Sequence, residues 1–434
     1  MSSFPPSDAP GRAPPADVAS VVDHLFRREA GRIVAILARR FGAEHLHLAE
    51  DVVQDALVKA MRTWPFTGVP GNPTAWILHV ARNRALDFAR HTRLGRIRQQ
   101  GFARVVEECL TDAVRAPAPQ FEEEIRDSQL RMMFVCCNPV LPVEGQVALT
   151  LKVLCGFGER EIAAAFLVGE AAIAKRLVRA RQALRARRVV VELPSAAELA
   201  PRVDAVLQVL YLLFSEGYKA SHGDTLLRED LCAEAIRLAE LLAANPPGDR
   251  PATHALLALM CFNAARLPAR IGANGGILRL AEQERALWDH GKIRNGVAWL
   301  EASGRGGEVS RFHLEAGIAA CHALAPSDEG TDWRQILEFY DELLARDASP
   351  VVALNRAVAV AKLRGPAEGL RSLEALPGRA SLEGYHLLHA VAGQLWLEAG
   401  EPDKAEASLR RAHALATLDA ERALLTRRLE EARA

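Results

Sequence analysis

The stretch that decides the fold of the first half of the chain is GEREIAAAFLVGEAAIAKRLVRARQALR, residues 158–185. It contains a short segment with helical periodicity at 159–166, a tight turn at 167–169, and a longer basic segment from Glu170 to about Arg187. A short helix joined by a glycine-containing turn to a second helix is the helix-turn-helix pattern. The sequence therefore predicts two helices here, the second of which would contact DNA.

This second helix has separate apolar and basic faces. Its buried stripe is predicted to contain Ile173, Leu177, Ala180 and Leu184. The remaining surface carries the candidate DNA-binding residues Lys175, Arg176, Arg179, Arg181 and Gln182. Long cationic side chains on an amphipathic helix suit the major groove of DNA. A plain surface helix and a membrane-lying helix are the alternatives, and the preceding short helix and turn favour DNA.

Residues 49–64 predict an earlier helix whose apolar side is formed by Val52, Val53, Ala56, Leu57, Ala60 and Met61. Its opposite side is mainly acidic and carries Glu50, Asp51, Gln54 and Asp55. Periodicity alone favours a solvated helix face for these four residues.

The following helix is predicted to begin near Asn72-Pro73-Thr74, because a proline near a helix start and a capping residue are typical of an N-terminus. One side of it carries His79, Arg82, Asn83, Asp87 and Arg90, and Trp76 lies near its beginning. Arginine neutralises phosphates, while the amide, imidazole and carboxylate groups can bond to base edges, and tryptophan can stack on an unpaired base. On these residues alone, an ordinary surface with Trp76 in the core is an equally good interpretation.

The 434 residues carry no net charge, but the charge is unevenly distributed. Residues 1–190 have a net charge of +7 and residues 191–434 have −7. Basic residues gather at 72–104 and again at 170–188, which suggests two contacts with a polyanion. The stretch between them, Glu107 to Asp127, is acidic and contains two prolines, so it is predicted to be a linker.

Together, these three segments resemble the extracytoplasmic-function (ECF) sigma factors of bacterial RNA polymerase over about residues 18–190. Ala49-Glu50-Asp51-Val52-Val53-Gln54-Asp55 with Trp64 is similar to the region-two helix that docks on the polymerase clamp. Ala75-Trp76-Ile77 with Ala81-Arg82-Asn83 and Asp87 is similar to the segment that melts and recognises the minus-ten element. Residues 158–185 are similar to the region-four helix-turn-helix that recognises the minus-thirty-five element. Three matches in this order make a strong signal.

The resemblance implies specific roles for the candidate residues. Glu50, Asp51, Gln54 and Asp55 would contact core RNA polymerase. The minus-ten DNA would be contacted by Trp76, His79, Arg82, Asn83, Asp87 and Arg90. The upstream element would be contacted by Lys175, Arg176, Arg179, Arg181 and Gln182. The sequence departs from many relatives in its alanine-rich recognition helix, Ala171, Ala172 and Ala174, so few direct contacts to bases are expected from this helix.

A minimal factor of this family would end near residue 190, and here 244 residues remain. They begin with a helical pattern at 203–214 and later contain a repeat in which Gly365 precedes Gly400 by 35 residues, close to the tetratricopeptide period. An α-solenoid-like, partly regular domain is therefore expected. It resembles the C-terminal tetratricopeptide-like (TPR-like) extension of one sigma-factor group, in which the motif around Tyr211 to Tyr218 recurs and the extension is thought to replace a separate anti-sigma factor.

The resulting prediction is an all-α chain in five parts: a disordered tail (1–17), a region-two domain (18–95), an acidic linker (96–125), a region-four domain (126–189) and a TPR-like regulatory domain (190–434).

A cytoplasmic protein is expected, since no spanning helix or secretory signal is visible. No cofactor, metal site or catalytic constellation is predicted; His45, His47, His386 and His389 lack further ligands at metal spacing. The seven cysteines are interpreted as reduced and mostly buried.

The partners expected are core polymerase, promoter DNA and an unidentified protein or small-molecule ligand of the C-terminal domain. A helix-turn-helix regulator that acts without polymerase stays open, and an enzyme with a scattered site in 200–345 is the weaker alternative.

Overall fold

The structure is a computed structural model that describes residues 30–39, 41–93, 118–166, 168–195, 197–218, 227–272 and 276–433. These residues form helices and turns with one isolated β-bridge between Ile271 and Ile277, and no strand occurs among them. The all-α prediction is confirmed for this part of the chain. The chain divides between Val209 and Leu210 into two compact units, here called unit 1 and unit 2. The predicted tail at 1–17 lies outside the described residues.

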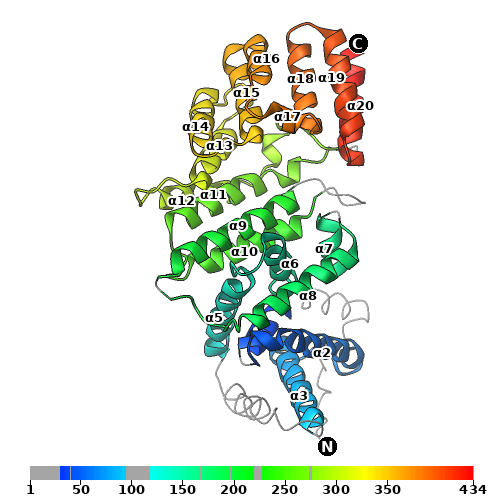
Figure 1. Cartoon of the computed structure of the whole chain (residues 1–434), viewed down its shortest axis with the longest axis vertical. Coiled ribbons are helices and arrows are strands. Elements are labelled where there is room, and N and C mark those ends of the chain that lie inside the picture. Colours follow the sequence, from blue (N-terminus) through cyan, green and yellow to red (C-terminus); the bar gives the residue numbers. More distant parts are fainter. Residues whose placement is uncertain are drawn as a thin grey trace, which may run out of the picture. The chain divides into compact units, whose positions relative to one another are not determined.

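Unit 1 is built from two groups of helices. In chain order they are a helical segment at 30–39, η1 (Ala43–His45), α2 (Leu46–Thr67), α3 (Pro73–Arg93), α5 (Ala118–Cys136), α6 (Val143–Val153), α7 (Glu159–Phe166), α8 (Glu170–Ala186) and the beginning of α9 (Leu199–Tyr218). Helix α2 packs on α3, while α5 packs on α6, and α6 and α7 pack on α8 (Figure 1).

Helix α5 begins at Ala118, inside the stretch 96–125 that the sequence analysis assigned to a linker. The helix start is compatible with its proline because Pro119 lies in the first turn, where its missing N–H has no helical partner to lose. The glutamates at 122–124 are good helix formers and extend the helix. Residues 96–117 of the predicted linker lie outside the described residues.

The two segments predicted as separate sigma domains contact each other within unit 1. The segment 30–39 approaches the end of α6 so closely that a side chain at Gly31 would collide with the carbonyl group of Leu154. Nearby, Arg39 donates a hydrogen bond to Asp127 at 2.7 Å, and η1 packs on α8.

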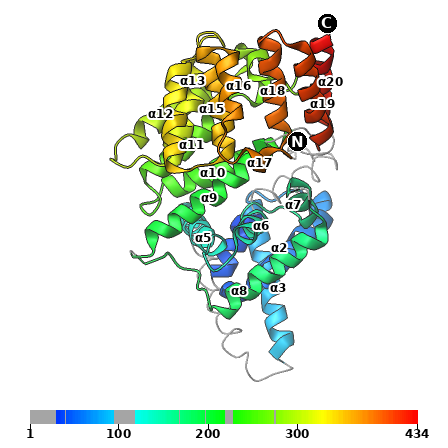
Figure 2. The same cartoon turned by 45° about the horizontal axis from the view of Figure 1, so that its top comes forward.

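Unit 2 is a series of helices that pack in chain order. They are α10 (Glu229–Ala243), α11 (Pro251–Ala264), α12 (His290–Ser303), α13 (Arg311–Leu324), α14 (Trp333–Arg346), α15 (Pro350–Arg364), α16 (Pro366–Glu374), α17 (Arg379–Leu382), α18 (His386–Glu398), α19 (Pro402–Leu415) and α20 (Asp419–Arg433), with short 3-10 turns η3 (Leu267–Ala269), η4 (Leu280–Glu282) and η5 (Arg285–Leu287). From α10 to α16 each helix contacts the next, and α18, α19 and α20 stand side by side (Figure 2). This order is typical of an α-solenoid; the TPR-like assignment itself stays a prediction.

The predicted repeat corresponds to two helical hairpins, α15–α16 and α18–α19. Gly365 ends the first helix of one hairpin with φ of +93°, and Gly400 lies in the turn of the other with φ of +77°. Both are conformations that glycine adopts without the strain a Cβ atom would cause. In the second hairpin, a side chain at Gly393 would collide with Leu409, so the small residue lets the two helices approach closely.

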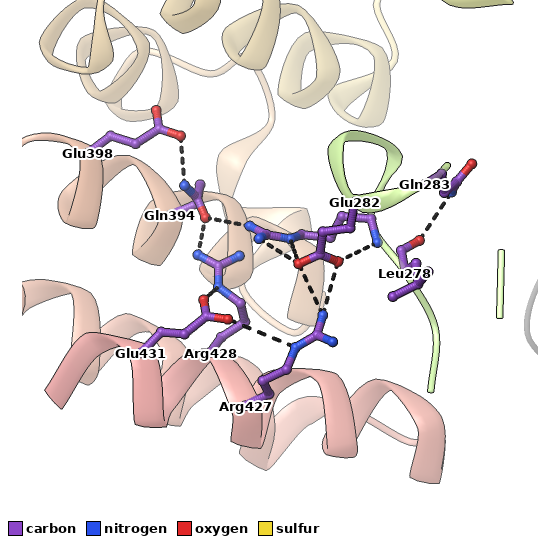
Figure 3. A network of polar contacts seen from close by, with 9 residues as sticks. Leu278, Glu282, Gln283, Gln394, Glu398, Arg427, Arg428 and Glu431 are labelled. Carbon is purple, nitrogen blue, oxygen red and sulfur yellow. Dashed lines mark hydrogen bonds and ion pairs between the residues drawn. The ribbon is translucent and has the colours of Figure 1, made fainter. Parts of the chain in front are cut away.

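A polar network joins distant parts of unit 2 (Figure 3). The carboxylate of Glu282 accepts hydrogen bonds from Arg279 at 2.7 Å and from Arg427 at 3.0 Å. Gln394 accepts from Arg279 at 3.2 Å and also from Arg428. The network thereby fixes the segment after η3 against α18 and α20, and it gives these arginines acidic or amide partners.

Candidate functional site

Helices α7 and α8 lie where the helix-turn-helix is predicted, and a short turn joins them. The turn is closed by a hydrogen bond from the Val168 N–H to the Ala163 carbonyl at 3.1 Å, and Gly158 N–H is capped by the Glu161 carboxylate at 2.8 Å. On α8 the four apolar residues predicted to be buried, Ile173, Leu177, Ala180 and Leu184, are all buried. Because the helix repeats every 3.6 residues, burial of these four residues places the cationic side of α8 toward solvent, as the sequence indicated.

Most of the candidate upstream-element residues are accessible. Lys175, Arg179 and Gln182 are exposed, and Arg176 is half-buried. No carboxylate of the described residues lies within ion-pair distance of Lys175, Arg176 or Arg179. Since internal acids do not neutralise these three charges, they are available to the phosphates of a nucleic acid.

Arg181 differs from its neighbours, because it is bound to Glu50 of α2. Its Nη2 lies 2.6 Å from Glu50 Oε2, and the two side chains are only 22% and 8% exposed. Burial raises the pKa of Glu50, while Arg181 and Lys152 act in the opposite direction. The ion pair connects the predicted polymerase-docking helix directly to the predicted recognition helix.

The burial of Glu50 corrects the expectation that it lies on an exposed acidic face. Glu50 follows buried Leu46 by four positions and precedes buried Val53 by three, so it lies at the edge of the apolar side of α2. The other three members of that face, Asp51, Gln54 and Asp55, are exposed. Asp55 approaches Arg84 at 3.7 Å, and both side chains are more than half exposed, so that ion pair is weak.

A groove of about 540 Å³ lies between α2 and α3. It is lined by Asp55, Val58, Lys59, Arg62, Val80, Asn83, Arg84 and Asp87. Asp55, Asn83 and Asp87 are candidates predicted from the sequence, whereas the cations at 59, 62 and 84 had no predicted role. Their signal was present, because Lys59 and Arg62 are one helical turn apart opposite the apolar side of α2.

The candidate minus-ten residues of α3 fall into exposed and buried groups. His79 and Asn83 are exposed and are joined by a hydrogen bond of 3.0 Å, and Asp87 is also exposed. Trp76 is half-buried and packs edge-on against buried Trp64, with the ring centroids 5.3 Å apart.

One candidate on α3, Arg82, does not lie on the exposed side of the helix. Arg82 is only 9% exposed, because it follows the buried stripe residues Leu78 and Ala81 on the inner side of the helix. The side chain of Arg90 lies outside the described residues.

Helices α2 and α3 both lie within the range of a known domain. Residues 25–94 match the family Sigma-70 region 2, and residues 202–304 match a family of unknown function, DUF6596. Over 390 residues the chain is 38% identical to the uncharacterized protein R00370 of Rhizobium meliloti, covering 89% of this chain and 90% of that protein. The chain belongs to the family of R00370. The predicted region-two domain is thus confirmed in this member of the R00370 family, together with its sigma-factor-like character.

A second similarity supports the N-terminal assignment. The chain is 30% identical over 163 residues to the ECF RNA polymerase sigma factor SigE of Mycolicibacterium smegmatis, and the match covers 38% of this chain and 60% of SigE. The region-four role of α7 and α8 stays a prediction.

The described part of the R00370-family protein also contains cysteines and histidines, which are common metal ligands. The six described cysteines are free, and all but Cys321 are buried. No group of three metal-ligating side chains is found there. None of the described helices combines the length and apolarity needed to span a membrane.

Proposed function

We propose that this protein is a sigma factor that binds core RNA polymerase and directs promoter-specific initiation, with unit 2 as a fused regulatory domain. The observation that carries the proposal is the Sigma-70 region 2 match over α2 and α3, followed in the chain by α7 and α8, the second of which carries cations that pair with no described acid. The exposed face at Asp51, Gln54 and Asp55 is where polymerase would dock. The exposed side of α3 would contact the minus-ten DNA, and α8 would hold the upstream element.

Within α8, upstream recognition would depend mainly on Lys175, Arg176 and Arg179. Arg181 is already bound to Glu50, so it would reach DNA only if that ion pair opened. The alanines at the start of α8 offer few hydrogen bonds to bases, and contact would be largely electrostatic. Promoter binding by the assembled holoenzyme should therefore weaken steeply as salt is raised.

The decisive experiment is run-off transcription with the full chain, purified core polymerase and genomic promoter fragments. Discrete transcripts that depend on the chain are expected. A chain that produces none, and does not co-migrate with core polymerase, would instead be a helix-turn-helix regulator that acts without polymerase.

Charge reversal on the docking face should separate polymerase binding from folding. The double substitution D51R and D55R is expected to weaken binding to core polymerase at least tenfold, because two exposed acids are replaced by cations. Binding is measured by fluorescence anisotropy at fixed salt, and circular dichroism checks that the helices are retained.

The matched control is E192R with D204R, which makes the same charge change at two exposed acids away from α2. Equal weakening in the control would mean that net charge alone is responsible. Unchanged binding of the D51R/D55R protein would reject this face as the docking surface.

A further inference from the structure

Three half-buried arginines of unit 2 have no carboxylate partner among the described residues. Arg228, Arg237 and Arg427 each lie within 3.0 Å of a carboxylate. Arg266, Arg270 and Arg285 are also half-buried, but none of them forms an ion pair with a described residue. This occurs in the half of the chain that carries a net charge of −7, where acids are plentiful.

The indole ring of Trp288 brings two of these arginines together. The guanidinium carbon of Arg285 lies 4.6 Å from the Trp288 ring centroid, and that of Arg266 lies 5.8 Å from it. Arg285 also donates hydrogen bonds to the carbonyl groups of His322 at 2.6 Å and Ala325 at 2.9 Å. Arg266 donates only to the side chain of Gln283, at 3.3 Å. The cluster is therefore held in place by neutral groups.

Arg270 adds a third charge on the side toward α9. Its guanidinium lies 4.0 Å from the ring centroid of Tyr218 and donates to the Tyr218 carbonyl. Burial lowers the pKa of Arg266 from its ordinary value, and Arg270 and Arg285 lower it further, while Tyr218 acts in the opposite direction. The three cations thus share one electrostatic environment.

Several buried polar atoms of the cluster have no hydrogen-bond partner among the described residues. They are Trp288 Nε1, Arg285 Nη2 and His322 Nδ1, and Trp288 is only 3% exposed. Burial, and then Arg266 and Arg285, lower the pKa of His322 to about 4. At neutral pH His322 is therefore uncharged and does not repel an anion.

Half-buried cations without an ion-pair partner are partly desolvated at a cost in free energy, and buried donors without an acceptor add to that cost. One bound oxyanion would satisfy both. A phosphate group fits better than a carboxylate, since it carries close to two negative charges and three acceptor oxygens, and guanidinium groups bond to it bidentately. Because Trp288 is buried, the occupant has to be small. We propose that Arg266, Arg270 and Arg285, with Trp288 and His322, bind the phosphate group of a small-molecule ligand.

The proposal is tested by calorimetric titration of the full chain with inorganic phosphate and pyrophosphate, at constant ionic strength maintained with chloride. Saturable binding is expected, and R266Q should weaken it at least tenfold. The matched control is R305Q, which removes an exposed arginine without an ion pair to a described residue and should bind phosphate like the unaltered protein. Equal binding by R266Q and the unaltered chain, or no saturable binding at all, would overturn the proposal. Citrate that binds as tightly as pyrophosphate would overturn the choice of phosphate.

A second measurement separates ligand binding from a purely structural role. In phosphate-free buffer, the Tm of R266Q should equal or exceed that of the unaltered chain, because the substitution removes a half-buried cation that has no ion-pair partner among the described residues. Added pyrophosphate should raise the Tm of the unaltered chain and of R305Q, and raise that of R266Q much less. A lowered Tm of R266Q with an undiminished pyrophosphate effect would show that Arg266 only supports the fold. Arg285 is less suitable for this test, because its two carbonyl bonds hold the end of α13.

Discussion

Replacing both Lys175 and Arg179 with glutamate is expected to reduce promoter-directed transcription by about a hundredfold or more. Each exposed cation that contacts DNA contributes about 1–3 kcal/mol, and reversing its charge adds repulsion from the phosphates. Neither residue forms an ion pair with a described acid, so the folded structure loses little. Run-off transcription measures the loss. The salt dependence of promoter binding should also become shallower, by about two in the slope of log K against log salt.

The matched control for this variant is R305E with R364E, which changes the net charge equally at two exposed arginines of unit 2. Transcription by the control should stay within about twofold of the unaltered chain, since these positions are outside the proposed DNA face. If both variants lose activity equally, bulk charge explains the effect. Retained activity of the K175E/R179E protein would remove α8 from the DNA interface.

Periodicity predicted the helix faces well where one side is apolar, although Met61, predicted on the apolar side of α2, is exposed. The stripe from Ile173 to Leu184 fixes which side of α8 is buried, and the structure has the same side inside. The start of α5 was missed because Pro117 and Pro119 indicated a linker, although a proline in the first turn does not oppose a helix. Local sequence thus identifies helix faces more reliably than it identifies boundaries.

The contacts between distant segments were beyond the reach of local sequence. Glu50 has the same residue type as its exposed neighbours, and only the packing of α2 against α8 shows that it is buried with Arg181. Likewise, Arg266 and Arg285 are 19 positions apart in an irregular segment, and no helical spacing brings them to the same indole ring. Charge patterning predicted the sign of the surfaces but not which charges pair internally.

The pairing of Glu50 with Arg181 leads to the second large effect, which concerns stability. The single substitution R181M leaves the Glu50 carboxylate buried without its partner, and the expected cost is about 3–5 kcal/mol in the free energy of opening unit 1. The double variant E50Q with R181M removes the charge as well and should recover most of that loss. Hydrogen exchange of the α2 and α8 amides measures the opening locally, which avoids interference from unit 2.

The effect of R181M should differ in size and in pH dependence from the effect of breaking an exposed ion pair. R84M breaks the exposed ion pair between Arg84 of α3 and Asp55 of α2, and it should cost less than about 0.5 kcal/mol. A carboxyl group whose pKa is raised in the folded state binds its proton more tightly there than in the unfolded state, so acid favours folding. The loss in R181M should therefore shrink as the pH falls from 7 toward 5, whereas that of R84M should not. A pH-independent loss, or equal losses in R181M and R84M, would mean that Glu50 and Arg181 do not hold α2 to α8.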